Sequence, residues 1–455
     1  MDDEKRNLTH EESSHGEWPS IRRWRQWWSE KLLPRYREIN RKYLGLPRLS
    51  LWGLVLLIVG VIGFYSDLSP FRQSRQMTGD FRVAVAAFEV MGDREARQLG
   101  DELAQGVFLR MEQAFDELSL DFTIEIWGPA EVGTISGATQ EERAYSALHM
   151  AEEIRADVII YGLLDTTQAI WTLTPEFYIS DQNFVDAQEI TGPHEIGRPF
   201  GTAGQGNVTT RIDISTKLGA RSQLLSLVTV GLAYYAARDY SHAQAYFQQI
   251  ESEYDWSEVG GREVLYLLLG NAAGKNENLD LAEDAYQKAL AENPDYSRAY
   301  AGLGSIHYIR ALKPAEETGD LASINVDLIN KSIASYEQAA AATVRPTLSD
   351  IVTKVHFGMG QAYLALHLQD ESKPVSPATQ EFEAVIADFG DGDNPRIREL
   401  AAEAHARLGL IHTTSGNLVE AITEYEQASL LLFDVPERQR LYEERLEELR
   451  NAILE

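Results

Sequence analysis

The spacing of apolar and polar residues changes character along the chain. Residues 49–66 form one uncharged run, LSLWGLVLLIVGVIGFYS. Between residues 79 and 185, short runs with strand periodicity alternate with runs of helical spacing, and from 220 to 434 only helical spacing is found. These periods predict an α+β multidomain chain with a single N-terminal transmembrane helix, a small α/β domain and a C-terminal all-α repeat array.

The run 49–66 is long enough to cross a bilayer. At about 1.5 Å per residue, a helix of this length measures about 27 Å, close to the hydrocarbon thickness of about 30 Å. Trp52 and Tyr65 lie near its ends, where aromatic residues favour the membrane interfaces. A buried core helix is the alternative, but the run has no polar face. A cleavable signal peptide fits poorly because no small-residue cleavage site follows the run.

Basic residues precede this run. Residues 20–48 hold nine Lys and Arg against two acidic residues. The positive-inside rule therefore places residues 1–48 in the cytoplasm and the bulk of the chain in the periplasm or another extracytoplasmic space. We expect a single-pass protein of the cell inner membrane whose basic, aromatic arm contacts the lipid bilayer. The predicted interface residues are Arg22, Arg23, Trp24, Arg25, Trp27 and Trp28. Binding of single-stranded nucleic acid by this arm is a less favoured alternative.

Residues 79–185 predict a small α/β domain with a mixed sheet. The expected order is strand, helix, strand, helix, strand, strand. The strands are FRVAVAAFEV, DFTIEIWG, VIIYGLLD and IWTLTPEFYIS, and helical spacing covers 92–118 and the segment that begins EERAYSALHM. Residues 186–219 are rich in Gly, Thr and Pro at their start and predict a linker.

Part of this domain resembles a known family. The helix LGDELAQGVFLRME and the strand ADVIIYG are similar to the N-terminal domain of TolB, a periplasmic translocation protein. The resemblance covers residues 79–180 and implies an envelope domain that contacts other proteins. TolB-like proteins continue into a β-propeller, whereas no propeller repeat follows here, so the partners of TolB are not carried over.

Residues 220–434 repeat a pattern of small and aromatic positions. Five glycines each follow Val, Leu or Met, and each is followed by a second segment with a small and then an aromatic residue. This spacing resembles tetratricopeptide (TPR) repeats of 34 residues. It implies five helix pairs with insertions near 311–328 and before Ala378, and residues 435–455 predict a capping helix. The small residue at repeat position 8 is expected to face the one at position 20, with aromatic residues in the adjacent layers. The predicted packing residues are Gly231, Ala243, Gly270, Ala282, Gly304, Tyr336, Gly360, Phe382, Gly409 and Ala421.

Repeat arrays of this kind bind partners in a groove. The first helices line a concave face that accepts an extended peptide or a partner helix. First-helix positions outside the core supply the candidate groove residues, which are Gln223, Asn271, Tyr308, Gln361 and Arg407.

Composition excludes several chemistries. The chain has no cysteine, which rules out thiolate metal sites and a cysteine nucleophile, and its net charge of −29 disfavours nucleic acid as a partner of the main body. GNAAGKN (270–276) is a shortened phosphate loop with Asn in place of Ser or Thr, and DFGDGDNPRIRE (388–399) has glycines at two calcium-ligand positions. We therefore expect no cofactor, no metal, no catalytic residues and no enzyme activity.

The combined prediction is a membrane-anchored TPR scaffold that recruits partner proteins through its repeat groove on the extracytoplasmic side. The alternative is a transmembrane sensor whose α/β domain binds a small ligand or an envelope component. The sequence does not identify the partner in either case.

Overall fold

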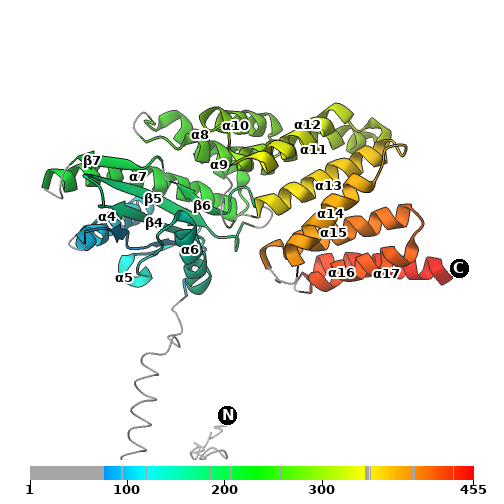
Figure 1. The fold of residues 1–455 in the computed structure, drawn as a ribbon, viewed down its shortest axis with the longest axis horizontal. Coiled ribbons are helices and arrows are strands. Elements are labelled where there is room, and N and C mark those ends of the chain that lie inside the picture. Colours follow the sequence, from blue (N-terminus) through cyan, green and yellow to red (C-terminus); the bar gives the residue numbers. More distant parts are fainter. Residues whose placement is uncertain are drawn as a thin grey trace, which may run out of the picture. The chain divides into compact units, whose positions relative to one another are not determined.

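The computed structural model describes residues 76–454 with short gaps (Figure 1). The gaps are 94–95, 119, 185–186, 196, 204–207, 257–258, 344–347, 349, 391–394 and 434. The described residues all belong to one compact unit, Arg75–Glu455.

A seven-stranded mixed sheet forms the first part of this unit. Its path is β3-β1-β4-β5-β6, with β2 paired to β4 and β7 paired to β5. β1 runs parallel to β3 and β4, whereas β4, β5, β6 and β7 pair antiparallel. The strands are β1 (Phe81–Val85), β2 (Glu89–Met91), β3 (Ile124–Trp127), β4 (Val158–Asp165), β5 (Ile170–Ile179), β6 (Gly192–Glu195) and β7 (Phe200–Ala203).

Helices cover both faces of the sheet because the buried strand β1 is apolar on both. Phe81, Val83 and Val85 belong to the core that also holds α4 (Arg97–Asp116), whereas Ala84 packs in the core on the other face. That second face is covered by α6 (Gln140–Ile154), which a capping box at Thr139 begins. A short helix, α5 (Pro129–Val132), follows β3.

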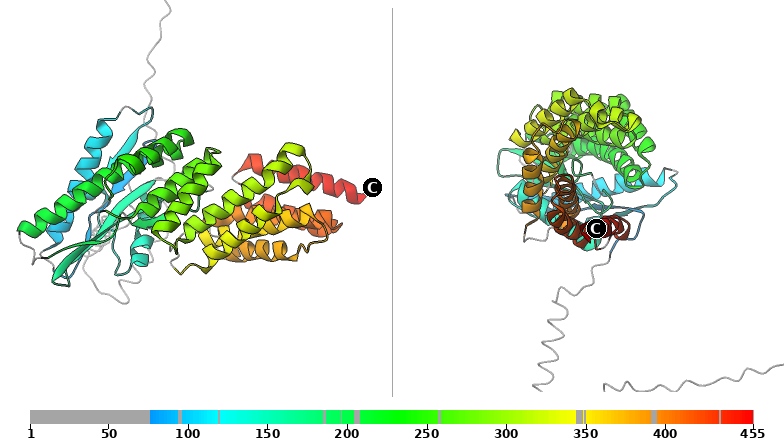
Figure 2. Two further views of the ribbon diagram at one scale, coloured as in Figure 1. Left: turned by 90° about the horizontal axis from the view of Figure 1, so that it is seen from above. Right: turned by 90° about the vertical axis from the view of Figure 1, so that its right-hand side faces the viewer.

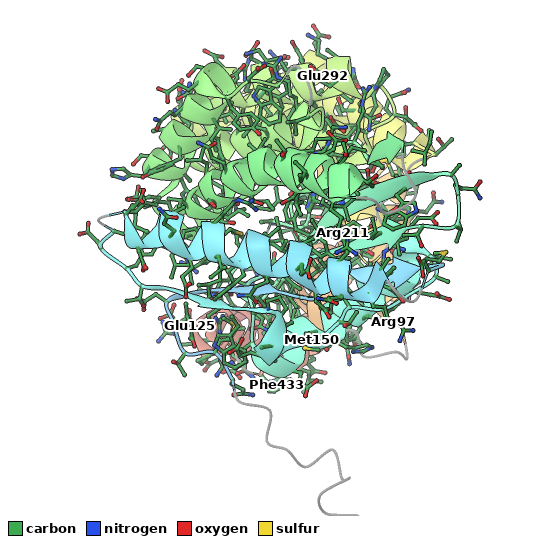
Figure 3. All side chains as sticks on the ribbon, turned by 90° about the vertical axis from the view of Figure 1, so that its left-hand side faces the viewer. Arg97, Glu125, Met150, Arg211, Glu292 and Phe433 are labelled. Carbon is green, nitrogen blue, oxygen red and sulfur yellow. The ribbon has the colours of Figure 1, made fainter. Side chains whose placement is uncertain are left out.

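Helix α7 (Val208–Ala236) connects the sheet to the repeats. Its first half lies beside α4, as Figure 3 shows with Arg97 on α4 and Arg211 on α7. Its second half pairs with α8 (Tyr240–Glu253). The segment 186–219, predicted as a linker, therefore contains β6, β7 and the start of α7. Strands rich in Gly and Pro have no clear periodicity, and these two form only because β5 supplies their hydrogen-bonding partner.

Four further helix pairs and a final helix follow along a curved path (Figure 2). They are α9 (Arg262–Lys275) with α10 (Leu279–Glu292), α11 (Ser297–Thr318) with α12 (Val326–Ala341), α13 (Ile351–Gln369) with α14 (Ser376–Phe389), α15 (Pro395–Thr414) with α16 (Leu418–Leu431), and lastly α17 (Pro436–Leu454). The insertion expected near 311–328 lengthens α11, which continues past Pro314, and adds a 3-10 turn, η4 (Leu321–Ser323).

The five repeat glycines lie against aromatic rings of the paired helices. A Cβ atom built on any of them would come within 3.0 Å of a ring carbon. The glycine–ring pairs are Gly231–Phe247, Gly270–Tyr286, Gly304–Tyr336, Gly360–Phe382 and Gly409–Tyr425. The small residues Ala243, Ala282 and Ala421 are fully buried in the second helices, but the nearest neighbours of the glycines are the rings, which fill the space that the missing side chains leave.

The predicted fold class needs a correction. In the part of the chain that the structure describes, no helix is both long and apolar enough to cross a membrane. The longest described helix, α7, carries the charged residues Arg211, Asp213, Lys217 and Arg221. The described fold is therefore a mixed sheet joined to a helical repeat array, without the transmembrane helix of the predicted class. Residues 49–66 and the six predicted interface residues at 22–28 lie outside the described residues.

The ring contacts lead to a prediction about stability. Gly270→Ala should lower the free energy of unfolding by about 1–3 kcal/mol, because the new methyl group meets Tyr286 at 2.8 Å in a packed core. Gly219→Ala in α7 is the matched control. Its Cβ would lie no closer than 3.5 Å to the flexible side chain of Arg110, so helix propensity should raise stability by up to about 1 kcal/mol. Denaturant unfolding measures the unfolding free energy of both variants. Equal changes in the two would contradict the close packing of Gly270 against Tyr286.

Candidate binding groove between the repeats and the sheet

A pocket of about 320 Å³ lies where the first helices of three repeats meet a turn from the sheet. Because a water molecule takes about 30 Å³ in the liquid, this volume corresponds to about ten water molecules. We call it the groove pocket. Its lining residues are Glu189, Asn271, Gly274, Lys275, Tyr286, Gly302, Ser305, Ile306, Tyr308, Ile309, Tyr336, Lys354 and Gln361.

The structure brings together most of the predicted groove residues. Asn271, Tyr308 and Gln361 come from α9, α11 and α13 and all line the groove pocket. Arg407 on α15 is close enough to Tyr308 to affect it: burial raises the pKa of the Tyr308 hydroxyl, and the positive charge of Arg407 opposes that rise. Gln223 is exposed on α7 and does not line the pocket.

Asn271 forms part of the pocket floor rather than an open contact surface. Its side chain is buried, its Oδ1 accepts a hydrogen bond from the hydroxyl of Tyr235, and its Nδ2 donates to Glu189 at 3.4 Å. A buried amide with both ends bonded holds a fixed orientation. Asn271 therefore positions its neighbours, whereas Gln361 and Tyr308 are only partly buried.

A buried ion pair joins the turn before β6 to the repeats. Lys354 at the start of α13 donates from Nζ to Glu189 Oε2 at 2.8 Å and to Gln188 Oε1 at 3.2 Å. The side chain of Glu189 is 3% exposed and that of Lys354 is 18% exposed. The sequence predictions missed both residues. Glu189 stands in a segment predicted to be a linker, and Lys354 has no distinctive spacing.

Arg298 holds the backbone of the same turn. Its side chain is buried, and it donates from Nη1 to the carbonyl of Glu189 at 2.9 Å and from Nη2 to the carbonyl of Pro193 at 3.2 Å. Burial lowers the pKa of Arg298 to about 10, so the guanidinium stays charged at neutral pH. Because it lies at the start of α11, Arg298 fixes the position of Glu189 relative to the groove pocket.

His194, on β6, also contacts Arg298. Its ring stacks on Phe177 with the centroids 5.0 Å apart, and its Nε2 lies 2.9 Å from Arg298 Nη1. Burial, and then the charge of Arg298, lower the pKa of His194 well below its usual value. The imidazole is therefore neutral in the folded protein.

Tyrosine rings from the second helices form the base of the groove pocket. Gly302 lies against Tyr286, and the hydroxyl of Tyr336 is 3.1 Å from Ser305 Oγ. Burial raises the pKa of Tyr286 well above its usual value and that of Tyr336 in the same direction, so both hydroxyls remain neutral. The pocket thus combines aromatic surface, neutral donors and charged groups.

The phosphate-loop-like motif of the sequence is part of a repeat helix. The sequence 270–276 lies at the end of α9, where Gly270 packs on Tyr286 and Lys275 lines the groove pocket. In the part of the chain that the structure describes, no group of three His, Asp or Glu residues could hold a metal ion. Asp391 and Asp393 of the calcium-like loop lie outside that part.

Comparisons with known proteins concern the repeats. Residues 267–317, which span α9 to α11, match the family described as tetratricopeptide repeat. A search of curated proteins found no match. The resemblance of residues 79–180 to TolB stays a prediction that no comparison tests.

Two solved structures are similar to part of the chain. One is a thermophilic TPR protein of Thermus thermophilus, with 17% identity, a TM-score of 0.35, and coverage of 49% of this chain and 98% of that chain. The other is the dimer of human IFIT1 with m7Gppp-AAAA, with 13% identity, a TM-score of 0.24, and coverage of 48% of this chain and 57% of that chain.

The hydrogen bonds from Arg298 to the turn before β6 predict that removing its guanidinium lowers the stability of the fold. Arg298→Met should lower the free energy of unfolding by about 2–4 kcal/mol, because the buried carbonyl oxygen of Glu189 and the partly buried one of Pro193 lose their donors. Arg440→Met, at a side chain that is 72% exposed, is the control and should change the free energy of unfolding by less than about 0.5 kcal/mol. Calorimetric unfolding of the two variants checks this, and similar losses in both would contradict the role of Arg298.

The neutral state of His194 predicts acid sensitivity. An unfolded histidine has a pKa of about 6.5, and a lowered folded pKa means that stability present above pH 6.5 is lost as the pH falls towards the folded pKa. His194→Phe keeps a ring against Phe177 but cannot titrate. From pH 7 to pH 5, the stability of the wild type relative to this variant should fall by up to about 1.4 kcal/mol per pH unit below 6.5. Denaturant titrations measure the difference in unfolding free energy between the wild type and His194→Phe. If this difference stays constant with pH, the pKa of His194 is not lowered by folding.

Proposed function

We propose that this chain, which carries tetratricopeptide repeats, is a scaffold that binds partner proteins and that the groove pocket is its binding site. TPR arrays serve protein–protein interaction by accepting peptides on their concave face. The proposal commits to one place on that face, where α9, α11 and α13 meet the turn from the sheet.

The composition of the groove pocket carries this proposal. Ile309 is 45% exposed although it lines a pocket, and Gln361 and Tyr308 place polar groups beside it. An extended peptide offers both an apolar side chain and free backbone amides at short intervals. A pocket that alternates apolar surface with amide and hydroxyl groups can bind both at once.

The proposed location rests on the sequence alone. The basic residues of 20–48 and the uncharged run 49–66 favour the cell inner membrane, with the repeats outside the cytoplasm. These residues lie outside the described part of the chain, and the lipid bilayer as a partner stays a prediction for the same reason. The expectation that the chain is not an enzyme also stays a prediction.

Site-specific crosslinking tests the proposed binding site. With benzoylphenylalanine in place of Gln361, the full-length chain should form defined adducts with a partner protein in the cells that produce it. The same replacement at Lys331, an exposed residue of the second helix α12, is the control and should not form them. A further change, Ile309→Asp, should lower adduct formation at position 361 at least about tenfold, because it puts a charge on apolar contact surface.

Either of two results would contradict the proposed binding site. If adducts form as readily at position 331 as at 361, or if Ile309→Asp leaves them unchanged while the protein stays folded, then the groove pocket is not the binding site.

A further inference from the structure

A second groove lies on the sheet side of the unit, between α4 and α7. Its volume is about 360 Å³, and we call it the α4–α7 groove. Figure 3 looks onto these two helices, with Arg97 labelled on α4 and Arg211 on α7. The groove shares no lining residue with the groove pocket, so the proposed function does not involve it. Its lining residues are Leu99, Glu102, Leu103, Arg110, Arg211, Ile212, Ser215 and Thr216.

Apolar side chains beside the α4–α7 groove face water. Ile212 on α7 is 61% exposed, and Leu109 on α4 is 52% exposed. The outward stripe of α7 extends over about four turns and holds no charge. It consists of the exposed residues Thr209, Ile212, Thr216, Ala220 and Gln223. Because 24% of the chain is charged, an uncharged stripe around an exposed isoleucine indicates an interaction surface.

The basic side chains of the α4–α7 groove are only weakly engaged within the protein. Arg211 Nη1 lies 4.0 Å from Glu102 Oε2, and these side chains are 43% and 50% exposed. Arg110 donates from Nη1 to the carbonyl of Gly106 on its own helix at 3.1 Å, and in the described part of the chain it has no carboxylate partner. An exposed ion pair at such a distance contributes little. Both guanidiniums are therefore available to an acidic group of a partner.

Helix α16 presents a matching surface at the other end of the unit (Figure 1). Val419 and Leu430 are 68% and 65% exposed, and with Thr423 and Gln427 they form an uncharged stripe along one side of the helix. The charges of the two helices are opposite. α16 has three Glu and no Lys or Arg, whereas α7 has three Lys and Arg and one Asp.

Glu420 is the acidic residue of α16 that stays open to a partner. Glu424 pairs with His405 Nδ1 at 2.7 Å, and Glu426 pairs with Arg450 Nη2 at 2.6 Å. Glu420 is exposed in the first turn, and no ion pair to another described residue involves it. Because it stands next to Val419, a guanidinium of a partner can bind this carboxylate while apolar surface covers the valine.

We propose that α16 of one copy docks into the α4–α7 groove of a second copy, so that the chain assembles head to tail. The apolar stripe of α16 covers Ile212 and Leu109, and Glu420 binds one of the two guanidiniums of the groove. A second copy is the occupant because this chain carries both complementary surfaces. Since α7 and α16 lie at opposite ends of the unit, one copy does not make this contact with itself. Contacts between unlike surfaces lead to rings or open chains of copies.

Disulfide crosslinking tests this contact, because a chain without cysteine forms disulfides only at introduced sites. Two differently tagged full-length copies, one with Thr216→Cys and one with Thr423→Cys, are produced together and oxidised in broken cells. Both residues are exposed near the centre of their stripes, so they come close whichever way α16 runs in the groove. An adduct that carries both tags is expected. Lys331→Cys on the exposed side of α12, in place of Thr423→Cys, is the matched control and should give none.

Charge reversal identifies the ion pair. Arg110→Glu and Arg211→Glu are tested separately on the Thr216→Cys copy, since the direction of α16 decides which guanidinium meets Glu420. One of them should lower the adduct yield about threefold to fivefold, as expected for an exposed ion pair, and Glu420→Arg on the other copy should restore the yield. Ile212→Asp should lower the yield about tenfold with either form of the other copy, because it places a charge on apolar contact surface.

Several results would overturn the head-to-tail contact. If Thr216→Cys copies crosslink to each other as readily as to Thr423→Cys copies, the α7 stripes pair with themselves. Adducts of the Thr216→Cys copy with other cellular proteins, in place of the Thr423→Cys copy, would show that the groove binds a different partner. The proposal is also wrong if Glu420→Arg restores neither charge reversal. None of these results affects the groove pocket, which crosslinking at position 361 tests separately.

Discussion

Helix α7 belongs to two structures at once, and the candidate site depends on that constraint. Its first half covers the sheet beside α4, and its second half is the first helix of the repeat array. Near its end, Tyr234 packs edge-on against Phe122 and Tyr235 stacks on Phe184, both from the sheet part. Apolar residues from the sheet, α4 and the helices up to α11 therefore form one continuous core. Because a packed core tolerates little displacement, the repeats cannot turn freely relative to the sheet.

That fixed geometry makes the groove pocket a shared site. The turn before β6 reaches the concave face of the repeats and places Glu189 between Asn271 of α9 and Lys354 of α13. Removing two charges from water is costly, and a buried ion pair often contributes little net stability. The effect of the ion pair here is to fix the position of Lys354. Lys354 is held at the pocket by a carboxylate from another part of the fold, and Arg298 fixes the backbone of that part.

The repeats were predictable because their constraints are local. Each glycine and the ring that covers it stand on two consecutive helices, so the spacing is visible in the sequence and needs no knowledge of distant contacts. The prediction that position 8 faces position 20 was less accurate, since the nearest neighbour of each glycine is the aromatic ring of the second helix. Of the groove residues, Asn271, Tyr308 and Gln361 follow from the same register, because first-helix positions outside the core line the concave side. Gln223 stands earlier in its repeat, eight residues before Gly231, and it is exposed on α7 away from the groove pocket.

By itself, the sequence determined the helix pairs, their register and the alternation of strands and helices before them, since periodicity of apolar residues is a property of neighbours along the chain. Only the tertiary structure decided that residues 186–219 form strands and a helix rather than a linker, because β6 and β7 exist through pairing with β5. It also decided that Glu189 and Lys354, 165 positions apart, form one ion pair in the groove pocket. No local pattern marks either residue, because the low exposure that gives their charges significance arises only when the sheet and the repeats share a core.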